Sequence, residues 1–223
     1  GRGGKGVFAL DVTNTDTLSE ANAPNIFKWQ FTEADDNSGD LGYIVEQDNT
    51  PSRFTGQPMS VAKMNNGKYA VMFGNGVESA NGSAALYIFF VNGPGGGAWS
   101  RTGTSASYIK LVVPTAAGGN GLAQPLWVDT DSDMIADAIY AGDLKGNLWK
   151  FDVKSSNPTE WKVALEGRPL FKAQSTDGNA ATFQPVTSAP EFAFHPKGGL
   201  VVAFGTGKAY SNVDFPDTSG RPH

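Results

Sequence analysis

The sequence predicts an all-β fold, a β-propeller of four-stranded antiparallel blades. Turn-forming residues are abundant, with 28 Gly and 13 Pro among 223 residues, and so are aromatic residues, with 14 Phe, 6 Tyr and 5 Trp. Many turns combined with many aromatic residues are typical of chains built from short strands. A unit of four apolar segments also recurs at intervals of about 60–70 residues, as expected of propeller blades.

Three Gln-Pro dipeptides mark this repeat. They begin at Gln57, Gln124 and Gln184, so they lie 67 and 60 residues apart. Each precedes an apolar strand that ends at a Gly turn, and these strands are predicted at Tyr69–Gly76, Ala138–Asp143 and Leu200–Gly207. A third strand is predicted at Ala85–Val91 and Asn147–Val153, and a fourth is predicted to begin at Trp99 and Trp161.

The N-terminal segment fits the same frame. Gly6–Val12 aligns with Gly146–Val153, and Trp29 lies 70 residues before Trp99. The predicted divisions are a partial blade at 1–50, a blade at 51–115, a blade at 120–172 and a partial blade at 180–215. We interpret the five Trp as blade packing. An ordinary β-sandwich is the alternative, but features that recur in the same order favour the propeller.

The predicted ring is incomplete. Typical propellers have about 4–8 blades, and an open ring would leave unpaired strand edges, which folded proteins avoid. We therefore expect the remainder of a longer chain, or other chains, to close it. The chain begins Gly1-Arg2 without Met, as expected of a processed or excerpted sequence.

Composition argues against several classes of protein. The sequence has no run of about 18 apolar residues, so we expect no transmembrane segment. Cys is absent, which excludes a disulfide scaffold. The net charge is −5 and the basic residues form no cluster, which argues against nucleic acid as a partner.

The loop at 129–137 carries the clearest chemical signal. Its carboxylates, Asp129, Asp131, Asp133 and Asp137, occupy loop positions 1, 3, 5 and 9 between two apolar runs. Four ionised carboxylates in one short loop repel one another, and a bound divalent cation removes that repulsion. Hard oxygen ligands suit calcium, whereas magnesium requires stricter octahedral geometry. The alternative is a solvated acidic turn without metal.

Position 6 of this loop departs from the usual pattern. Loops of this kind commonly carry Gly there because the chain turns sharply, and this sequence has Met134. A positive φ is disfavoured for a residue other than Gly. We therefore expect a reshaped turn and an altered affinity for the cation.

Three further signatures accompany the acidic loop. They are Gly3–Val12 (GGKGVFALDV), Tyr140–Asp152 (YAGDLKGNLWKFD), and Ser188–Glu191 leading to Phe204–Lys208 (FGTGK). Together they resemble the C-terminal propeller of the PilY/PilC-type proteins, the type IV pilus tip-associated adhesins and biogenesis factors. The resemblance covers nearly the whole chain.

This resemblance implies a modified, quinoprotein-like ring that carries one calcium ion in the nine-residue loop. The implied ligands are Asp129, Asp131, Asp133, the carbonyl of Ile135, and Asp137. The family's separate N-terminal adhesive region is not expected in these 223 residues, so the resemblance implies no adhesion specificity that resides in that region.

The resemblance also implies a role in pilus assembly, control of retraction, surface attachment and twitching motility. The implied partners are minor pilins of the pilus tip and host or abiotic surfaces. The implied location is the cell surface, at the pilus tip or outer membrane of a Gram-negative bacterium.

The other candidate motifs do not predict a catalytic site. His195 and His223 fit neither a catalytic triad nor a zinc spacing, and no GxSxG is present. Residues 93–97 (GPGGG) lack the Lys-Ser/Thr of a phosphate loop and are interpreted as a connector. The second acidic stretch, Asp35–Asp40, is interpreted as a solvated loop because no strand follows it in matching register.

A quinone-dependent dehydrogenase is the alternative function, because such enzymes share the propeller architecture and also use calcium. Many of them place a vicinal Cys pair under the quinone, and this chain has no Cys. We also expect the acidic loop at the edge of a blade, away from the ring axis. The pilus-associated module is therefore favoured over an enzyme.

Overall fold

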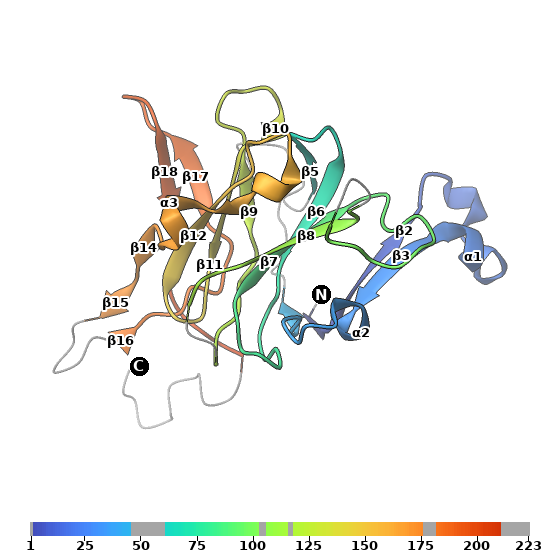
Figure 1. The fold of residues 1–223 in the computed structure, drawn as a ribbon, viewed down its shortest axis with the longest axis horizontal. Helices are drawn as coiled ribbons and strands as arrows, with labels where there is room; N and C mark the ends of the chain where they lie inside the picture. The colour runs from blue at the N-terminus through green and yellow to red at the C-terminus, as the bar shows by residue number, and fades with distance from the viewer. Residues whose placement is uncertain (1, 46–60, 103–105, 116–117, 176–181, 211–223) are drawn as a thin grey trace.

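The computed structural model describes residues 2–45, 61–102, 106–115, 118–175 and 182–210. Within these ranges the chain is mostly strand, with a few short helices (Figure 1). The strands are β1 (Arg2–Gly4), β2 (Gly6–Leu10), β3 (Phe27–Thr32), β4 (Ile44–Val45), β5 (Val61–Met64), β6 (Tyr69–Gly74), β7 (Ala85–Phe90), β8 (Tyr108–Val112), β9 (Leu126–Val128), β10 (Ile135–Ala136), β11 (Ala138–Gly142), β12 (Asn147–Asp152), β13 (Lys162–Val163), β14 (Phe171–Lys172), β15 (Gln174–Ser175), β16 (Thr182–Phe183), β17 (Glu191–Phe194) and β18 (Leu200–Ala203). The helices are α1 (Ala23–Ile26), α2 (Glu33–Asp36) and α3 (Ala164–Gly167), with 3₁₀ turns η1 (Thr15–Thr17), η2 (Glu20–Asn22) and η3 (Pro158–Glu160).

Two antiparallel sheets form the centre of the molecule. One joins β5, β6, β7 and β8 in chain order, and the other joins β9, β11, β12 and β13. Strand β10 adds to the first sheet in parallel with β5, and β14 adds to the second by pairing with β12. Smaller pairs flank them, namely β2 with β3 before and β17 with β18 after. These four-stranded meanders agree with the predicted blade architecture, and the sheets do not close into a ring over the described residues.

The predicted blade limits remain predictions. Gln57, together with the rest of 46–60, lies outside the described residues, as do parts of the two terminal partial blades. Among the described helices, none has the length and apolar character required to cross a membrane.

The fourth strand of the first sheet differs from the prediction. It is β8, which begins at Tyr108, and Trp99 lies before it outside any strand. The Trp99 ring packs edge-on against Trp29 at 5.2 Å between centroids, and its Nε1 donates to the Gln30 carbonyl at 2.8 Å. The Trp therefore marks the interface between sheets, while the strand forms where the chain returns to pair with β7.

Strand β7 shows how the sheets stack. All six of its side chains are buried, as expected of a strand that is covered on both faces. Ala85, Tyr87 and Phe89 belong to one apolar cluster, and Leu86, Ile88 and Phe90 belong to another. Because successive side chains point to opposite faces, the strand packs against a neighbouring layer on each side.

Three apolar layers result from this stacking. The first lies between the β2–β3 pair and the β7–β8 strands, the second between the two central sheets, and the third between β9 with β11 and the β17–β18 pair. Trp29 is buried in the first layer, and Trp149 and Trp161 are buried in the second. Trp99 packs against the first and Trp127 against the second, so the interpretation of the Trp residues as blade packing is confirmed.

Backbone contacts join successive sheets at one end. Tyr43 bridges to Val77, and Leu122 bridges to Asp143. Gly76, with φ +74°, donates to the Leu122 carbonyl at 3.1 Å. A Cβ at Gly76 would lie 1.9 Å from the Tyr43 carbonyl oxygen, so only Gly allows this approach. These contacts join the sheets just beyond the C-terminal ends of β6 and β11.

Candidate metal centre

The acidic loop lies between β9 and β11, the first two strands of the second central sheet. Its last residues form β10, in which Ile135 pairs with Lys63 of the neighbouring sheet. The Asn65 side chain donates to the Ala136 carbonyl at 2.9 Å and adds a second link. The end of the loop is therefore fixed at the junction of two sheets, while residues 130–134 are exposed and project beyond the strands (Figure 1).

Three of the predicted ligands converge. Carboxylate oxygens of Asp129, Asp131 and Asp137 all lie within 4.8 Å of one another. Asp133 is not part of this group, and its Oδ1 accepts a hydrogen bond from the Ile135 backbone N–H at 2.8 Å. The structure thus brings together positions 1, 3 and 9 of the loop and leaves position 5 turned toward the backbone.

Asp129 organises the loop backbone. Its Oδ1 accepts from the N–H groups of Asp131 at 3.1 Å and Ser132 at 2.7 Å, and its Oδ2 accepts from Met134 N–H at 2.7 Å. Desolvation by burial raises the pKa of Asp129, but hydrogen bonds from these backbone groups outweigh it and lower the pKa overall. The loop therefore holds this carboxylate ionised.

Asp137 is the buried member of the group, with 5% of its surface exposed. Its Oδ2 accepts from both the backbone N–H, at 2.9 Å, and the hydroxyl of Thr130. Its own N–H donates to the Val128 carbonyl at 3.0 Å, and its carbonyl accepts from Val153 at 3.1 Å. Strand pairing therefore fixes the position of this carboxylate.

Met134 adopts the backbone conformation that Gly would usually supply. Its φ is +66°, and its side chain is 70% exposed. Ser132 also has a positive φ, +69°. The expected reshaping of the turn is therefore not observed: the turn is kept, with non-Gly residues in the left-handed region, which costs roughly 1–2 kcal/mol per residue.

Lys154 lies beside the same carboxylates, and the sequence reasoning missed it. Its Nζ is 3.5 Å from Asp131 Oδ2 and 3.9 Å from Asp137 Oδ1. The Val153 N–H donates to the Asp137 carbonyl, so the next residue, Lys154, lies beside the loop. The signal for Lys154 was the register of the β11–β12 hairpin, which places the end of β12 next to the start of β11.

The donor set fits a hard divalent cation. It consists of carboxylate oxygens alone, the ligand type that calcium and magnesium prefer. Two ligands at 2.3–2.6 Å from one calcium ion can lie up to about 5 Å apart, and the three carboxylates meet that limit. Asp129, Asp131 and Asp137 would hold the ion.

The second acidic stretch is not the solvated loop that was predicted. Asp36 and Asp40 are buried, and the ammonium of Lys110 from β8 lies between them. Lys110 Nζ is 3.3 Å from Asp36 Oδ1 and 2.7 Å from Asp40 Oδ2, and 2% of its side chain is exposed. The prediction failed because Lys110 is 70 residues from Asp40 in the sequence.

Hydrogen bonds complete this buried ion cluster. Tyr87 donates its hydroxyl to Asp36 at 2.6 Å, and Ser83 donates to Asp40 at 2.5 Å. Burial raises the pKa of Asp40, but hydrogen bonds led by the one from Lys110 outweigh it and lower the pKa to about 2. Burial likewise opposes ionisation of Asp36, whose pKa is nevertheless lowered. One buried ammonium and several hydrogen bonds from the protein thus stabilise both carboxylates.

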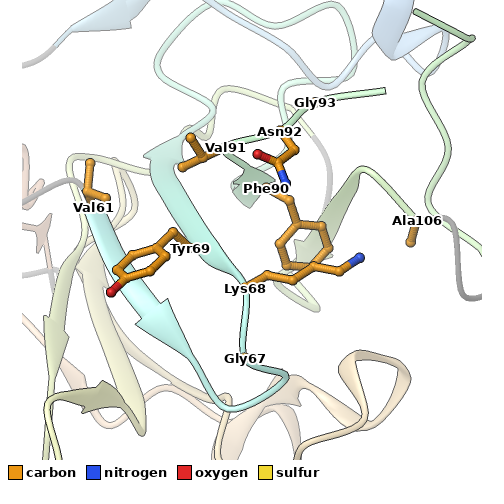
Figure 2. Close-up of a pocket in the computed structure, with 9 residues that line it drawn as sticks. All are labelled: Val61, Gly67, Lys68, Tyr69, Phe90, Val91, Asn92, Gly93 and Ala106. Carbon is orange, nitrogen blue, oxygen red and sulfur yellow. The ribbon is translucent and has the colours of Figure 1, made fainter. Parts of the chain in front are cut away.

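A hollow of 490 Å³ lies beside the turn between β5 and β6. Figure 2 shows Lys68 crossing the ring of Phe90 there, with Asn92 above the ring and Tyr69 on the strand alongside. The Lys68 ammonium is 4.8 Å from the Phe90 ring centroid. The described residues that line the hollow include no carboxylate or imidazole, so they offer no acid–base pair.

The remaining sequence candidates have structural positions. His195 is exposed in the turn between β17 and β18, where its Nδ1 accepts from Lys197 N–H at 3.1 Å. His223 lies outside the described residues. Residues 93–97 follow β7 as a turn, as interpreted from the sequence.

Comparisons with known proteins identify the relatives of this chain. The PilY1 beta-propeller domain family matches residues 1–222. The type IV pilus biogenesis factor PilY1 of Pseudomonas aeruginosa is 36% identical over 236 residues, covering 97% of this chain and 17% of that protein. A PilY1 homolog of Xylella fastidiosa is 34% identical over 227 residues, covering 96% of this chain and 14% of that protein.

A solved structure agrees with these relatives. The C-terminal domain of Pseudomonas aeruginosa PilY1 superposes with a TM-score of 0.72 at 34% identity, over 95% of this chain and 40% of that chain. The match confirms the β-propeller fold class, and the relatives are named as pilus biogenesis factors rather than as dehydrogenases. The chain spans less than a fifth of the length of its curated relatives and belongs to the PilY1 β-propeller domain family.

Proposed function

We propose that this chain is part of the calcium-binding propeller of a type IV pilus biogenesis factor and tip adhesin. In that role it regulates pilus extension and retraction, surface attachment and twitching motility. The names of the relatives support the pilus assignment. The convergence of Asp129, Asp131 and Asp137 within 4.8 Å is the observation that supports the cation.

A bound calcium ion would supply two positive charges that offset most of the repulsion among the clustered carboxylates. Asp129 and Asp137 are already held in place by backbone and Thr130 donors, so they would bind with little rearrangement. Asp133 and the Ile135 carbonyl are proposed to complete the ligand set. Asp133 would have to move toward the other three carboxylates, because its Oδ1 accepts from the Ile135 N–H in this structure.

The loop position suggests what the ion would do. Because β10 pairs with β5 of the neighbouring sheet, ordering the loop also stiffens the junction between the two sheets. We infer a structural and regulatory ion rather than a catalytic one. A change in calcium concentration would thereby change the rigidity of the surface that the propeller presents to its partners.

The partners proposed for this module are minor pilins at the pilus tip and host or abiotic surfaces. Further chain, from the same protein or another, is proposed to close the ring. The proposed location is the bacterial cell surface, at the pilus tip or outer membrane of a Gram-negative bacterium. These assignments are supported by the pilus-related names of the relatives.

Isothermal titration calorimetry with calcium tests the cation directly. We expect saturable binding in the range of about 10⁻⁴–10⁻³ M, as for other extracellular calcium modules. Asp129→Asn and Asp133→Ala should weaken binding, whereas Asp16→Asn, an exposed carboxylate in η1, should not. Absence of binding heat at millimolar calcium would refute the calcium assignment.

A motility assay tests the regulatory role. Cells that carry Asp129→Asn in their own copy of this propeller should lose the calcium dependence of twitching, while Asp16→Asn cells keep it. If both strains twitch equally at every calcium concentration, calcium binding at this loop does not regulate the pilus.

A further inference from the structure

Lys154 occupies a distinctive place at the acidic loop. It follows β12, and its ammonium lies 3.5 Å from Asp131 and 3.9 Å from Asp137. Both carboxylates belong to the group of three that converges in the loop. The protein thus places one of its own cations beside the oxygen atoms that a divalent cation would need.

The contact is loose. The Lys154 side chain is 60% exposed, and its ammonium sits on a flexible four-carbon stem. Exposed ion pairs of this kind contribute little to stability and are weakened by salt. Lys154 can therefore leave the carboxylates without disturbing the fold. A dication that contacts three carboxylates at once makes stronger interactions than a single ammonium at the edge.

We propose that Lys154 is a tethered counter-ion that competes with the divalent cation for Asp131 and Asp137, and so sets the cation concentration at which the loop fills. This inference rests on the proposed calcium site. In the cation-free loop the ammonium offsets the carboxylate charge. When the dication binds, the ammonium must move into solvent, and its repulsion with the dication opposes binding.

Calorimetric titration of Lys154→Met with calcium tests the competition. Met keeps most of the apolar stem and removes the charge. We expect the calcium dissociation constant to fall about three- to tenfold, because the two exposed ion pairs of Lys154 no longer compete with the cation. The gain should shrink at high salt, where the ammonium is screened.

Two control variants isolate the position of the charge. Lys154→Arg keeps the positive charge and should bind calcium as the unmodified protein does. Lys150→Met removes the same charge four residues earlier on β12, about 13 Å along the strand, and should change the dissociation constant less than twofold.

A second readout uses the protein without calcium. At low salt, Lys154→Met should lower the midpoint of thermal unfolding slightly, because the carboxylates lose their counter-ion. Saturating calcium should then raise the midpoint by more in the variant than in the unmodified protein. An unchanged calcium-free midpoint together with an equal calcium-induced rise would contradict the counter-ion role.

The outcomes distinguish this inference from the proposed function. If the unmodified protein and Lys154→Met bind calcium equally, within twofold, the competition is refuted and the calcium site stands. Weaker binding by Lys154→Met would also refute it. If neither protein binds calcium, the proposed calcium site fails and the inference fails with it. Tighter binding by the variant alone supports the competition.

Discussion

The acidic segment at Asp35–Asp40 and the acidic loop at 129–137 crowd carboxylates together to a similar degree, yet their charges are balanced differently. In the first, Lys110 is buried between Asp36 and Asp40, at 2.7 Å from the nearer carboxylate oxygen. In the second, Lys154 is exposed and stands 3.5 Å or more from the carboxylates.

This difference separates an internal ion cluster from a candidate ion site. Burying a carboxylate is costly unless a partner neutralises it, so the segment at 35–40 depends on Lys110. In the loop at 129–137, Asp137 is also buried, but Asp131 is exposed and Asp129 is half-buried, so the group opens to solvent on one side. Local sequence is alike in the two places. The position of the distant lysine, buried in one and exposed in the other, separates them.

The largest expected effect is the loss of Lys110. Lys110→Met leaves two buried carboxylates without a cation, and breaking a buried pair costs about 3–5 kcal/mol. Urea unfolding should show that loss, whereas Lys154→Met should change the calcium-free stability by less than about 1 kcal/mol. Similar losses in both variants would contradict the contrast between the clusters.

Acid should weaken the buried cluster next. The pKa of Asp40 falls from 3.8 to about 2 on folding, so its stabilisation is complete above about pH 4 and is lost as the pH falls toward 2. The difference corresponds to about 2 kcal/mol. The free energy of unfolding, measured between pH 5 and pH 2, should depend less on pH in Asp40→Asn than in the unmodified protein. An equal dependence on pH would argue against the pairing.

Calcium should distinguish the two acidic segments. Asp129→Asn removes a converging carboxylate and should raise the calcium dissociation constant by about tenfold, or 1.4 kcal/mol. Asp40→Asn should leave it unchanged, since the Asp40 carboxylate is buried and paired with Lys110. Calorimetry on both variants measures this, and weakened binding in Asp40→Asn would place the ion elsewhere.

The smallest expected effect concerns the turn inside the loop. Met134→Gly relieves a left-handed residue, φ +66°, and should stabilise the loop by up to about 1 kcal/mol. Calorimetry should then show tighter calcium binding by Met134→Gly, or thermal unfolding should show a higher midpoint. Met134→Ala retains the Cβ and the strain, so it should give no gain; an equal gain there would point to the exposed side chain instead.

Much of the fold and part of the site could be predicted from short-range patterns. Alternating apolar segments and Gly turns predicted the meanders, and the spacing of Asp129, Asp131 and Asp137 predicted their convergence. The same reasoning failed at Trp99, because a Trp that packs between sheets need not begin a strand. Asp133, which the same spacing grouped with these ligands, accepts a hydrogen bond from the Ile135 N–H and stays a proposed ligand.

The sequence by itself determined the repeating blades, the acidic loop and the family, because each is written in residues close together along the chain. The tertiary structure decided which acidic segment has a buried lysine as its counter-ion. Lys110 and Asp36 are 74 residues apart, and Lys154 and Asp131 are 23 apart, so only the stacking and register of the strands bring them together. The balance of charge depends on distances between side chains in space, and these distances cannot be predicted from the pattern of neighbouring residues in the sequence.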